Sequence, residues 1–387
     1  MTGSARSFLK RVRRPLAILG LTALAIGVIA AFAAAVKFSA DLRTGDSQDR
    51  AQESDSGAPG PPPQFPASDY QAGRSAAPPD KPLIGVNYTH HGFRDCSFED
   101  TAILRTYSRP RLAAKVHRQL LRMRQAGVTT IRTIVWHMTD ATRETWGPIS
   151  SAGGRPAEPY RTNLIRFVRE IRRFGFKRLT VSFGPQKTQN ALLVTYDPAT
   201  FEENWGFVRS IRALVRRHGP PQTRFDLLNE GAPSEAPTEW SPAPDQTGRY
   251  LSRIYRAYVG RYGNRDVSVS AISWDGAGRV RSLVGALRAS GRPLPRWYDV
   301  HIGYTAAQAS YALRTTDAVL RQSGVRRPLV VGETSYDSDE VARVIQRFLQ
   351  RSRRPIEEVS PWFVRTMEGC QVSPPYRPGA YARVRSG

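Results

Sequence analysis

Three absences limit what this 387-residue sequence can be. No glycine-rich loop follows the first predicted strand, "LIGVNY" (83 to 88), which disfavours a doubly wound nucleotide-binding sheet. No basic block is interleaved with aromatic residues as in single-strand binders, so we expect no nucleic-acid partner. Acidic residues are scarce, because 33 Asp and Glu stand against 57 Lys and Arg, which leaves a net charge of +24.

The basic excess is almost entirely arginine and has two interpretations. A positive surface attracts polyanions such as nucleic acid, anionic lipid or an acidic polysaccharide. Alternatively, codon bias enriches arginine on solvated helix faces such as "FVREIRRFGFKR" and "IRALVRRHG". Charge alone therefore does not name a ligand.

The N-terminal region predicts a membrane anchor. Residues 1–14 form a basic tail, and the uncharged run 15–36 is long enough to cross a bilayer. The positive-inside bias places the tail in the cytoplasm and the rest of the chain outside it. A cleaved signal peptide, giving a secreted protein, is the alternative. Residues 37–80 are rich in Pro, Gly and Ser, which predicts a linker.

From residue 81 onward, short β-rich runs alternate with amphipathic helical patterns, which indicates repeated βα units and a parallel sheet. The predicted strands are 83–88, 129–136, 177–184, 223–230, 267–274, 297–304, 328–334 and 361–366. Helices are expected in stretches such as 111–127, 163–175 and 339–353. Eight strands predict a (β/α)8 TIM barrel over 81–387, an α/β fold with its last helix short or missing.

Chemistry in such a barrel sits at the carboxyl ends of the strands. The fourth predicted strand ends in Asn229 and Glu230, and the seventh ends in Glu333. Two glutamates at one mouth suit retaining glycoside hydrolysis, in which one carboxyl protonates the leaving oxygen and the other attacks the sugar. Arg132 lies inside the second strand, where a charge needs a partner, so we expect it to pair with Glu333 and lower its pKa. An Arg on the barrel exterior is the alternative.

On these residues the chain, from about 81 to 370, resembles the clan A retaining glycoside hydrolases, of the cellulase-like family five or family thirty-nine type. The resemblance implies that Glu230 is the acid/base, Glu333 the nucleophile, and Asn229 a hydrogen-bond partner of the sugar 2-hydroxyl. It also implies supporting or substrate-binding roles for a further set of residues. These are Arg132, His301, Tyr304 and Trp362, the last as a sugar-stacking platform or alternatively a core residue.

Other features leave alternatives open. Asn87 ends the first strand and either contacts sugar or caps a loop. His90, His91, His137 and His301 raise a metal-dependent hydrolase, although their pattern is poor for it, so we expect neither metal nor other cofactor. A barrel that binds glycan without cleaving it is a further alternative.

Cys96 and Cys370 follow the first and eighth predicted strands, so a disulfide between them is expected in an exported domain. Two unpaired thiols are the alternative. The sequence thus predicts a membrane-tethered, extracytoplasmic retaining β-glycosidase. We expect it to act on a cell-envelope or extracellular polysaccharide, acidic polymers included.

Overall fold

The computed structural model describes residues 64–74, 82–92, 101–140, 147–192, 197–239, 241–363, 380–381 and 384. The predicted anchor (15–36), Cys96 and Cys370 lie outside these ranges. Within them, no helix has both the length and the apolar character needed to span a bilayer. The chain divides into the units Met1–Ala58 and Pro59–Gly387, and the second contains every element described below.

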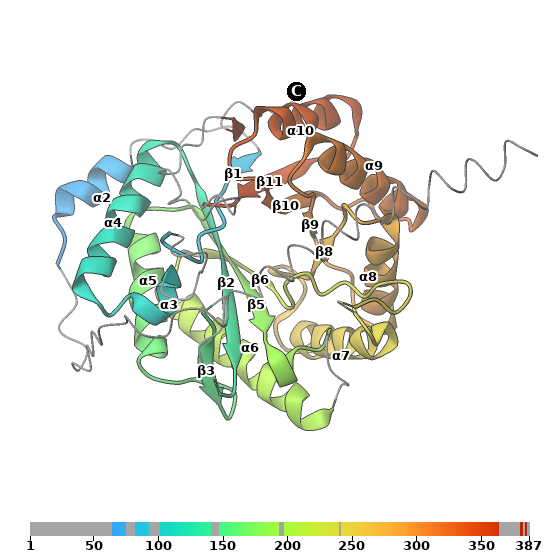
Figure 1. Ribbon diagram of the computed structural model, residues 1–387, viewed down its shortest axis with the longest axis horizontal. Helices are drawn as coiled ribbons and strands as arrows, with labels where there is room; N and C mark the ends of the chain where they lie inside the picture. Colours follow the sequence, from blue (N-terminus) through green and yellow to red (C-terminus); the bar gives the residue numbers. More distant parts are fainter. Residues whose placement is uncertain are drawn as a thin grey trace, which may run out of the picture. The chain divides into compact units, whose positions relative to one another are not determined.

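Eight parallel strand positions close into a ring, with helices outside it (Figure 1). In ring order they are β1 (Leu83–Ile84), β2 (Thr130–Met138), β5 (Arg178–Pro185), β6 (Gln222–Asp226), β7 (Val267–Ser268) continued by β8 (Ser270–Ile272), β9 (Tyr298–His301), β10 (Leu329–Thr334) and β11 (Ile356–Pro361). The ring closes because β11 pairs with β1, and Tyr88 N donates to Arg132 O of β2 at 2.7 Å. The predicted barrel therefore forms.

Helices connect successive strands, as the apolar spacing predicted. They are α3 (Ile103–Thr106), α4 (Pro110–Gln125), α5 (Tyr160–Arg173), α6 (Pro198–His218), α7 (Pro244–Tyr262), α8 (Ala277–Ala289), α9 (Ala306–Gln322) and α10 (Asp339–Arg351). Short β3 (Ile149–Ala152), β4 (Arg155–Pro156) and the 3-10 turn η2 (Lys187–Gln189) lie in the loops that follow β2 and β5.

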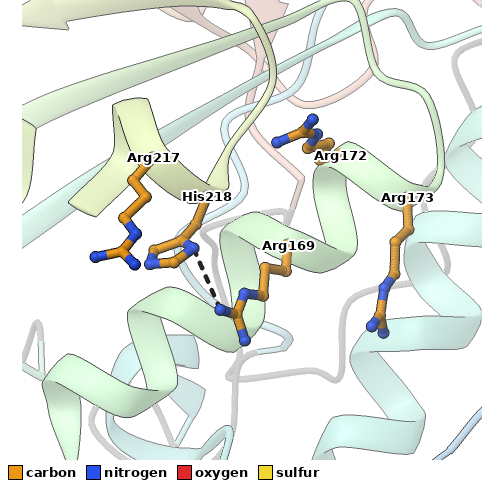
Figure 2. A pocket seen from close by; sticks show the side chains of 5 residues that line it. All are labelled: Arg169, Arg172, Arg173, Arg217 and His218. Carbon is orange, nitrogen blue, oxygen red and sulfur yellow. Dashed lines mark hydrogen bonds between the residues drawn. The ribbon is translucent and has the colours of Figure 1, made fainter. Parts of the chain in front are cut away.

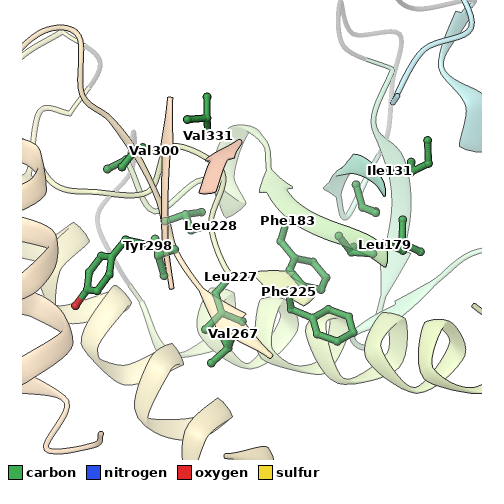
Figure 3. Packing of buried hydrophobic residues seen from close by; sticks show 14 of the residues in the cluster. Ile131, Leu179, Phe183, Phe225, Leu227, Leu228, Val267, Tyr298, Val300 and Val331 are labelled. Carbon is green, nitrogen blue, oxygen red and sulfur yellow. The ribbon is translucent and has the colours of Figure 1, made fainter. Parts of the chain in front are cut away.

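The apolar core lies between the strands and the helices (Figure 3). Alternate strand residues such as Leu179, Val181 and Phe183 of β5 are buried in it. The residues between them, Thr180 and Ser182, are buried as well but belong to the polar interior of the ring. This alternation follows from the two-residue period of a strand.

The eighth strand was predicted wrongly at 361–366, because it runs from Ile356 to Pro361. Its sequence, "IEEVSP", carries two glutamates that conceal the strand pattern. Glu358 is fully buried and accepts from Arg178 at 3.0 Å, while Glu357 pairs with Arg224. Cross-strand ion pairs let these acidic residues occupy a strand.

The predicted linker (37–80) was also too long, because α2 (Ala67–Arg74) packs against α4. His117 of α4 lies between two carboxylates: its Nε2 is 2.9 Å from Asp69 Oδ2, and its Nδ1 is 2.5 Å from Glu170 Oε1. Contacts between residues this far apart in sequence are invisible to a compositional argument. Residues 67–74 therefore belong to the folded domain.

Candidate active site

Glu333 is the penultimate residue of β10 and lies at the carboxyl ends of the strands. It is almost entirely buried, with 4% of its surface exposed. Its Oε1 accepts from Arg132 Nη1 at 2.8 Å, and its Oε2 accepts from the indole N–H of Trp362 at 3.1 Å. Both donors favour the ionised carboxylate and fix its orientation. The ion pair expected between Arg132 and Glu333 is present.

Glu230 stands four residues beyond the end of β6 and keeps 30% of its side chain exposed. Its backbone has φ of 55°, a left-handed conformation that is costly for a residue with a side chain. The strained turn is held by Ser270, whose Oγ accepts from Glu230 N at 2.7 Å. This arrangement turns the carboxyl group back over the mouth of the barrel.

The two glutamates share one site with His301. One ligand atom from each of Glu230, His301 and Glu333 lies within 4.8 Å of the others. His301 Nδ1 is 3.0 Å from Glu230 Oε1 and 3.6 Å from Glu333 Oε1. The two glutamates, separated by about a hundred positions in the sequence, therefore meet at one site.

His301 is neutral, with its proton on Nδ1. Its Nε2 lies 3.2 Å from Arg132 Nη2, which can only donate, so Nε2 must accept and Nδ1 carries the hydrogen. Burial lowers the pKa of His301 to about 4, and the nearby Glu333 charge only partly opposes this. The imidazole therefore donates to Glu230 Oε1 without adding a positive charge to the site.

The pKa values of the glutamates are both raised, but unequally. Burial raises the pKa of Glu230 to about 7, against the smaller opposing effects of Arg132 and Arg279. Burial also raises the pKa of Glu333 above 4.5, although His301 and Arg132 pull it down. Arg132 lowers the pKa of Glu333, as predicted, but desolvation outweighs the ion pair and leaves the pKa raised on balance.

Arg132 is fully buried and cannot contact a substrate, so its inclusion among sugar-binding residues was wrong. It lies inside the ring rather than on the exterior, and its guanidinium reaches Asp226 of β6 at 3.1 Å as well as Glu333. Burial disfavours its charge, yet the surrounding carboxylates raise its pKa on balance. Arg132 therefore positions side chains at the mouth through its hydrogen bonds and ion pairs.

Asn87 also supports the site instead of contacting sugar, which corrects the prediction. Only 1% of it is exposed. Its Oδ1 accepts from Arg132 at 2.9 Å, and its Nδ2 donates to the carbonyl groups of Gly332 and Ser360. All of its polar atoms are engaged by the protein, so it ties β1 to β10 and β11 beneath Glu333.

The side-chain amide of Asn229 uses its oxygen within the protein and leaves its N–H group for a substrate. Its Oδ1 accepts from Arg132 Nη2 at 2.8 Å and from Ser182 Oγ at 3.2 Å, which fixes the amide so that Nδ2 is the free donor. Within the described part of the chain, Nδ2 has no protein partner and is not among the buried unpaired atoms. The arrangement can present an N–H group to a sugar hydroxyl.

Aromatic side chains line the rim. Tyr304 is 46% exposed, and its ring centroid is 5.9 Å from that of Trp274, which follows β8. Trp362 follows β11 directly, so it lies at the carboxyl end of its strand, but only 7% of it is exposed. Its stacking role, and contact between Tyr304 and a substrate, stay predictions. Trp274 was missed, although its place after a strand could have indicated it.

The sequence reading also missed the polar interior beneath the glutamates. Asp226 Oδ2 accepts from Ser182 Oγ at 2.5 Å, and its Oδ1 accepts from Ser270 N at 2.9 Å. Asp299 of β9 is fully buried 3.6 Å from Arg132 Nε, and burial raises its pKa well above its ordinary value. The signal was present as polar residues at every second position of strands such as "LTVSF" and "VSVSA".

Among the described residues, the histidines considered as possible metal ligands do not form a cluster. His137 lies in β2, stacks on Phe207 with ring centroids 4.0 Å apart, and contacts Asn204. The triad of Glu230, His301 and Glu333 has ligand-like spacing. However, the Arg132 guanidinium contacts both His301 and Glu333, and its positive charge opposes a cation there. Among the described residues, this site suits proton chemistry better than metal binding.

Comparisons with known proteins add only a likeness of fold. No protein-family model matches the chain, and neither does any curated protein. Similar solved structures include a broad-specificity endoglucanase from Ruminococcus champanellensis with bound cellotriose, at 11% identity, covering 79% of this chain and 92% of that one, with TM-score 0.47. A structure of fungal β-1,4-galactanases has 10% identity, covers 72% and 88% respectively, and has TM-score 0.48.

A glucosidase from Croceicoccus marinus is 13% identical, covers 63% of this chain, and has TM-score 0.46. This chain spans 55% of that glucosidase and 60% of a protein from Neocallimastix frontalis. At such identities and TM-scores the likenesses support no functional conclusion. What the chain can do depends on its own mouth residues.

Proposed function

We propose that this protein is a retaining β-glycoside hydrolase, with Glu230 as acid/base and Glu333 as nucleophile. The observation that carries the proposal is the spacing of Glu230 and Glu333, whose facing oxygens lie within 4.8 Å of each other. Retaining enzymes hold their carboxyl groups about 5 to 5.5 Å apart, whereas inverting enzymes need about 6.5 to 9.5 Å to admit a water. The shorter spacing leaves no room for that water.

The first step forms a covalent bond between Glu333 and the sugar. A Glu333 oxygen attacks the anomeric carbon while Glu230 gives its proton to the departing glycosidic oxygen, so the broken C–O bond is replaced by a glycosyl ester. The pKa of about 7 leaves Glu230 protonated in mildly acidic solution. Arg132 and Trp362 hold Glu333 ready for attack.

The second step returns both carboxyl groups to their starting states. Glu230, now ionised, takes a proton from water, which attacks the anomeric carbon and releases Glu333. The free Nδ2 of Asn229 is placed to donate to the sugar 2-hydroxyl, an interaction that strengthens in the transition state. Two inversions at one carbon give net retention.

The polysaccharide class and the location belong to the proposal as well. We expect a β-linked polymer of the cell envelope or surroundings, reached from an N-terminal anchor. That anchor remains a prediction from residues 1–36. The cellotriose of the solved endoglucanase shows only what that enzyme binds.

The test is hydrolysis of a panel of β-glucans, mannans and acidic exopolysaccharides by the full chain, with the product anomer followed by NMR. Glu230→Gln should lower kcat/KM by about 10² to 10⁴-fold on unactivated glycosides. Glu333→Gln should abolish the glycosyl-enzyme and turnover. Glu235→Gln is the matched control, because this exposed carboxylate lies on the same loop and pairs with Arg281.

Two results would contradict the proposal. An inverted product would show that water attacks directly and that the carboxyl spacing has been misinterpreted. If wild type and Glu333→Gln bind glycan equally and neither cleaves it, the protein is a non-catalytic glycan-binding barrel.

A further inference from the structure

The end of the barrel opposite the mouth gathers arginines. Helices α4 to α10 each connect neighbouring parallel strands, so all of them run against the strands and end at the face opposite the mouth. Every one of the seven has arginine in its last turn. These arginines are Arg122, Arg124, Arg172, Arg173, Arg216, Arg217, Arg261, Arg288, Arg321 and Arg351.

The mouth, in contrast, carries carboxylates together with arginines such as Arg161, Arg279 and Arg281. Its described loops and first helical turns carry a series of carboxylates. They include Asp140, Asp197, Glu235, Glu239, Asp245, Asp275, Asp337, Asp339 and Glu340. Helix dipoles favour this distribution, since anions are stabilised near helix N-termini and cations near C-termini.

On the basic face, a hollow of about 310 Å³ is lined by four arginines and a histidine (Figure 2). Arg169, Arg172 and Arg173 come from the end of α5, and Arg217 and His218 from the end of α6. None of the residues lining the hollow is acidic. Figure 2 shows Arg169 directed toward His218, whose Nδ1 is 3.3 Å from the guanidinium.

Several arginines around the hollow pair with carboxylates, and one of them is Arg173 of the lining, whose Nη1 is 3.9 Å from Glu170 Oε2. Arg212 and Arg216, on helix α6, both pair with Asp266. In the hollow, Arg169 instead contacts His218, and burial together with the charges of Arg169 and Arg217 lowers the pKa of His218. Like charges gathered around one concave surface repel one another, and an oxyanion placed among them would relieve that repulsion.

We propose that this hollow, formed by Arg169, Arg172, Arg217 and His218, binds the oxyanion groups of a linear acidic polysaccharide. Arginine suits carboxylate, sulfate and phosphate groups because its planar fork donates two hydrogen bonds at once. Exposed arginines at the ends of α4, α7, α8 and α10 extend the positive face along which such a polymer can continue. They are Arg122, Arg261, Arg288 and Arg351. This docking surface is separate from the mouth and does not depend on the proposed hydrolase activity.

The lining chemistry favours a glycan over two other polyanions. Single-stranded nucleic acid needs aromatic side chains on which bases stack, and the five residues of the hollow include none apart from the histidine ring. A bilayer surface is bound with apolar side chains inserted beside the basic ones. The large apolar side chains exposed in the described part of the chain, Tyr304 and Tyr311, lie at the mouth and in the first half of α9.

The experiment compares two triple variants of the full chain. Arg169→Ala/Arg172→Ala/Arg217→Ala removes three of the four arginines that line the hollow and leaves Arg173, which lies near Glu170. The control, Arg314→Ala/Arg343→Ala/Arg347→Ala, removes the same charge from exposed positions on α9 and α10. Binding of a polygalacturonate oligomer is measured by calorimetry at several salt concentrations. Inorganic phosphate, phosphatidylglycerol vesicles and a single-stranded oligonucleotide are measured in parallel.

The hollow variant should bind polygalacturonate about tenfold more weakly, the sum of three exposed ion pairs. Its salt dependence should be shallower by about two units of slope. The control should change affinity by less than about twofold, and both variants should keep the wild-type melting temperature because the altered side chains are exposed.

Several outcomes would overturn the proposal. Equal losses in both variants would show attraction by net charge alone, and no loss in the hollow variant would show that the polymer binds elsewhere. Phosphate binding as tight as polymer binding would reduce the hollow to a single-ion site. Vesicles or oligonucleotide binding through the hollow while polygalacturonate does not would replace the glycan by that partner.

Discussion

The pH dependence of catalysis is the sharpest consequence of the paired glutamates. In the proposed mechanism Glu230 carries a proton in the first step, and burial raises its pKa to about 7. Each pH unit above that value leaves about a tenth as much of the protonated form, so kcat/KM should be about tenfold lower at pH 8 than its plateau and about a hundredfold lower at pH 9.

The acid limb is set by Glu333, which must be ionised to attack. Because its pKa is raised above 4.5, activity should begin to fall at a higher pH than for an exposed glutamate. The expected profile is therefore a bell whose alkaline limb falls near pH 7 and whose acid limb is displaced upward from that of an exposed glutamate. The two apparent values belong to the coupled pair as a whole, because Glu230 and Glu333 also influence each other.

The assay is kcat/KM from about pH 4 to pH 9 on a glycoside with a poor leaving group, which reports the free enzyme. A dinitrophenyl glycoside serves as the control, because its leaving group departs without being protonated. The pH profile for formation of the glycosyl-enzyme from this substrate should therefore lack the alkaline limb. Glu230→Gln should lose that limb as well. An alkaline limb that persists unchanged in Glu230→Gln would refute the assignment of the acid.

Two further predictions concern stability. Arg132→Met leaves Asp226 and Glu333 without their buried cation. The free energy of unfolding, measured by urea denaturation, should therefore fall by about 3 to 5 kcal/mol. A loss below about 1 kcal/mol would show that Arg132 does not stabilise these carboxylates. At His117, burial lowers the pKa but the two carboxylates raise it on balance, so the charged form is stabilised on folding. Wild type should exceed His117→Gln in stability most below about pH 6.5, and this advantage should shrink as pH rises through the folded-state pKa. A pH-independent difference would show that packing alone is responsible.

The sequence by itself determined the order of the elements and the residues at strand ends. Apolar runs with turn residues between them located seven of the eight strands. Glu333 lies near the end of β10 as predicted, whereas Glu230 lies four residues beyond β6 instead of ending it. Arg132 was recognisable because a charge in an apolar strand requires a partner. These signals are local, since they depend on spacing along a single segment.

Only the tertiary structure decided what the polar residues do for one another. Asn87 supports Arg132 because ring closure brings β1 against β2 and β11, and no pattern within "LIGVNY" encodes that contact. Strand β11 was hidden because its glutamates find arginines on distant strands. The raised pKa of Glu333 likewise follows from desolvation inside the assembled barrel, which exceeds the effect of its ion pair. Burial, and contacts between strands far apart in the sequence, depend on how the barrel closes. The pattern of residues along the chain therefore does not specify them.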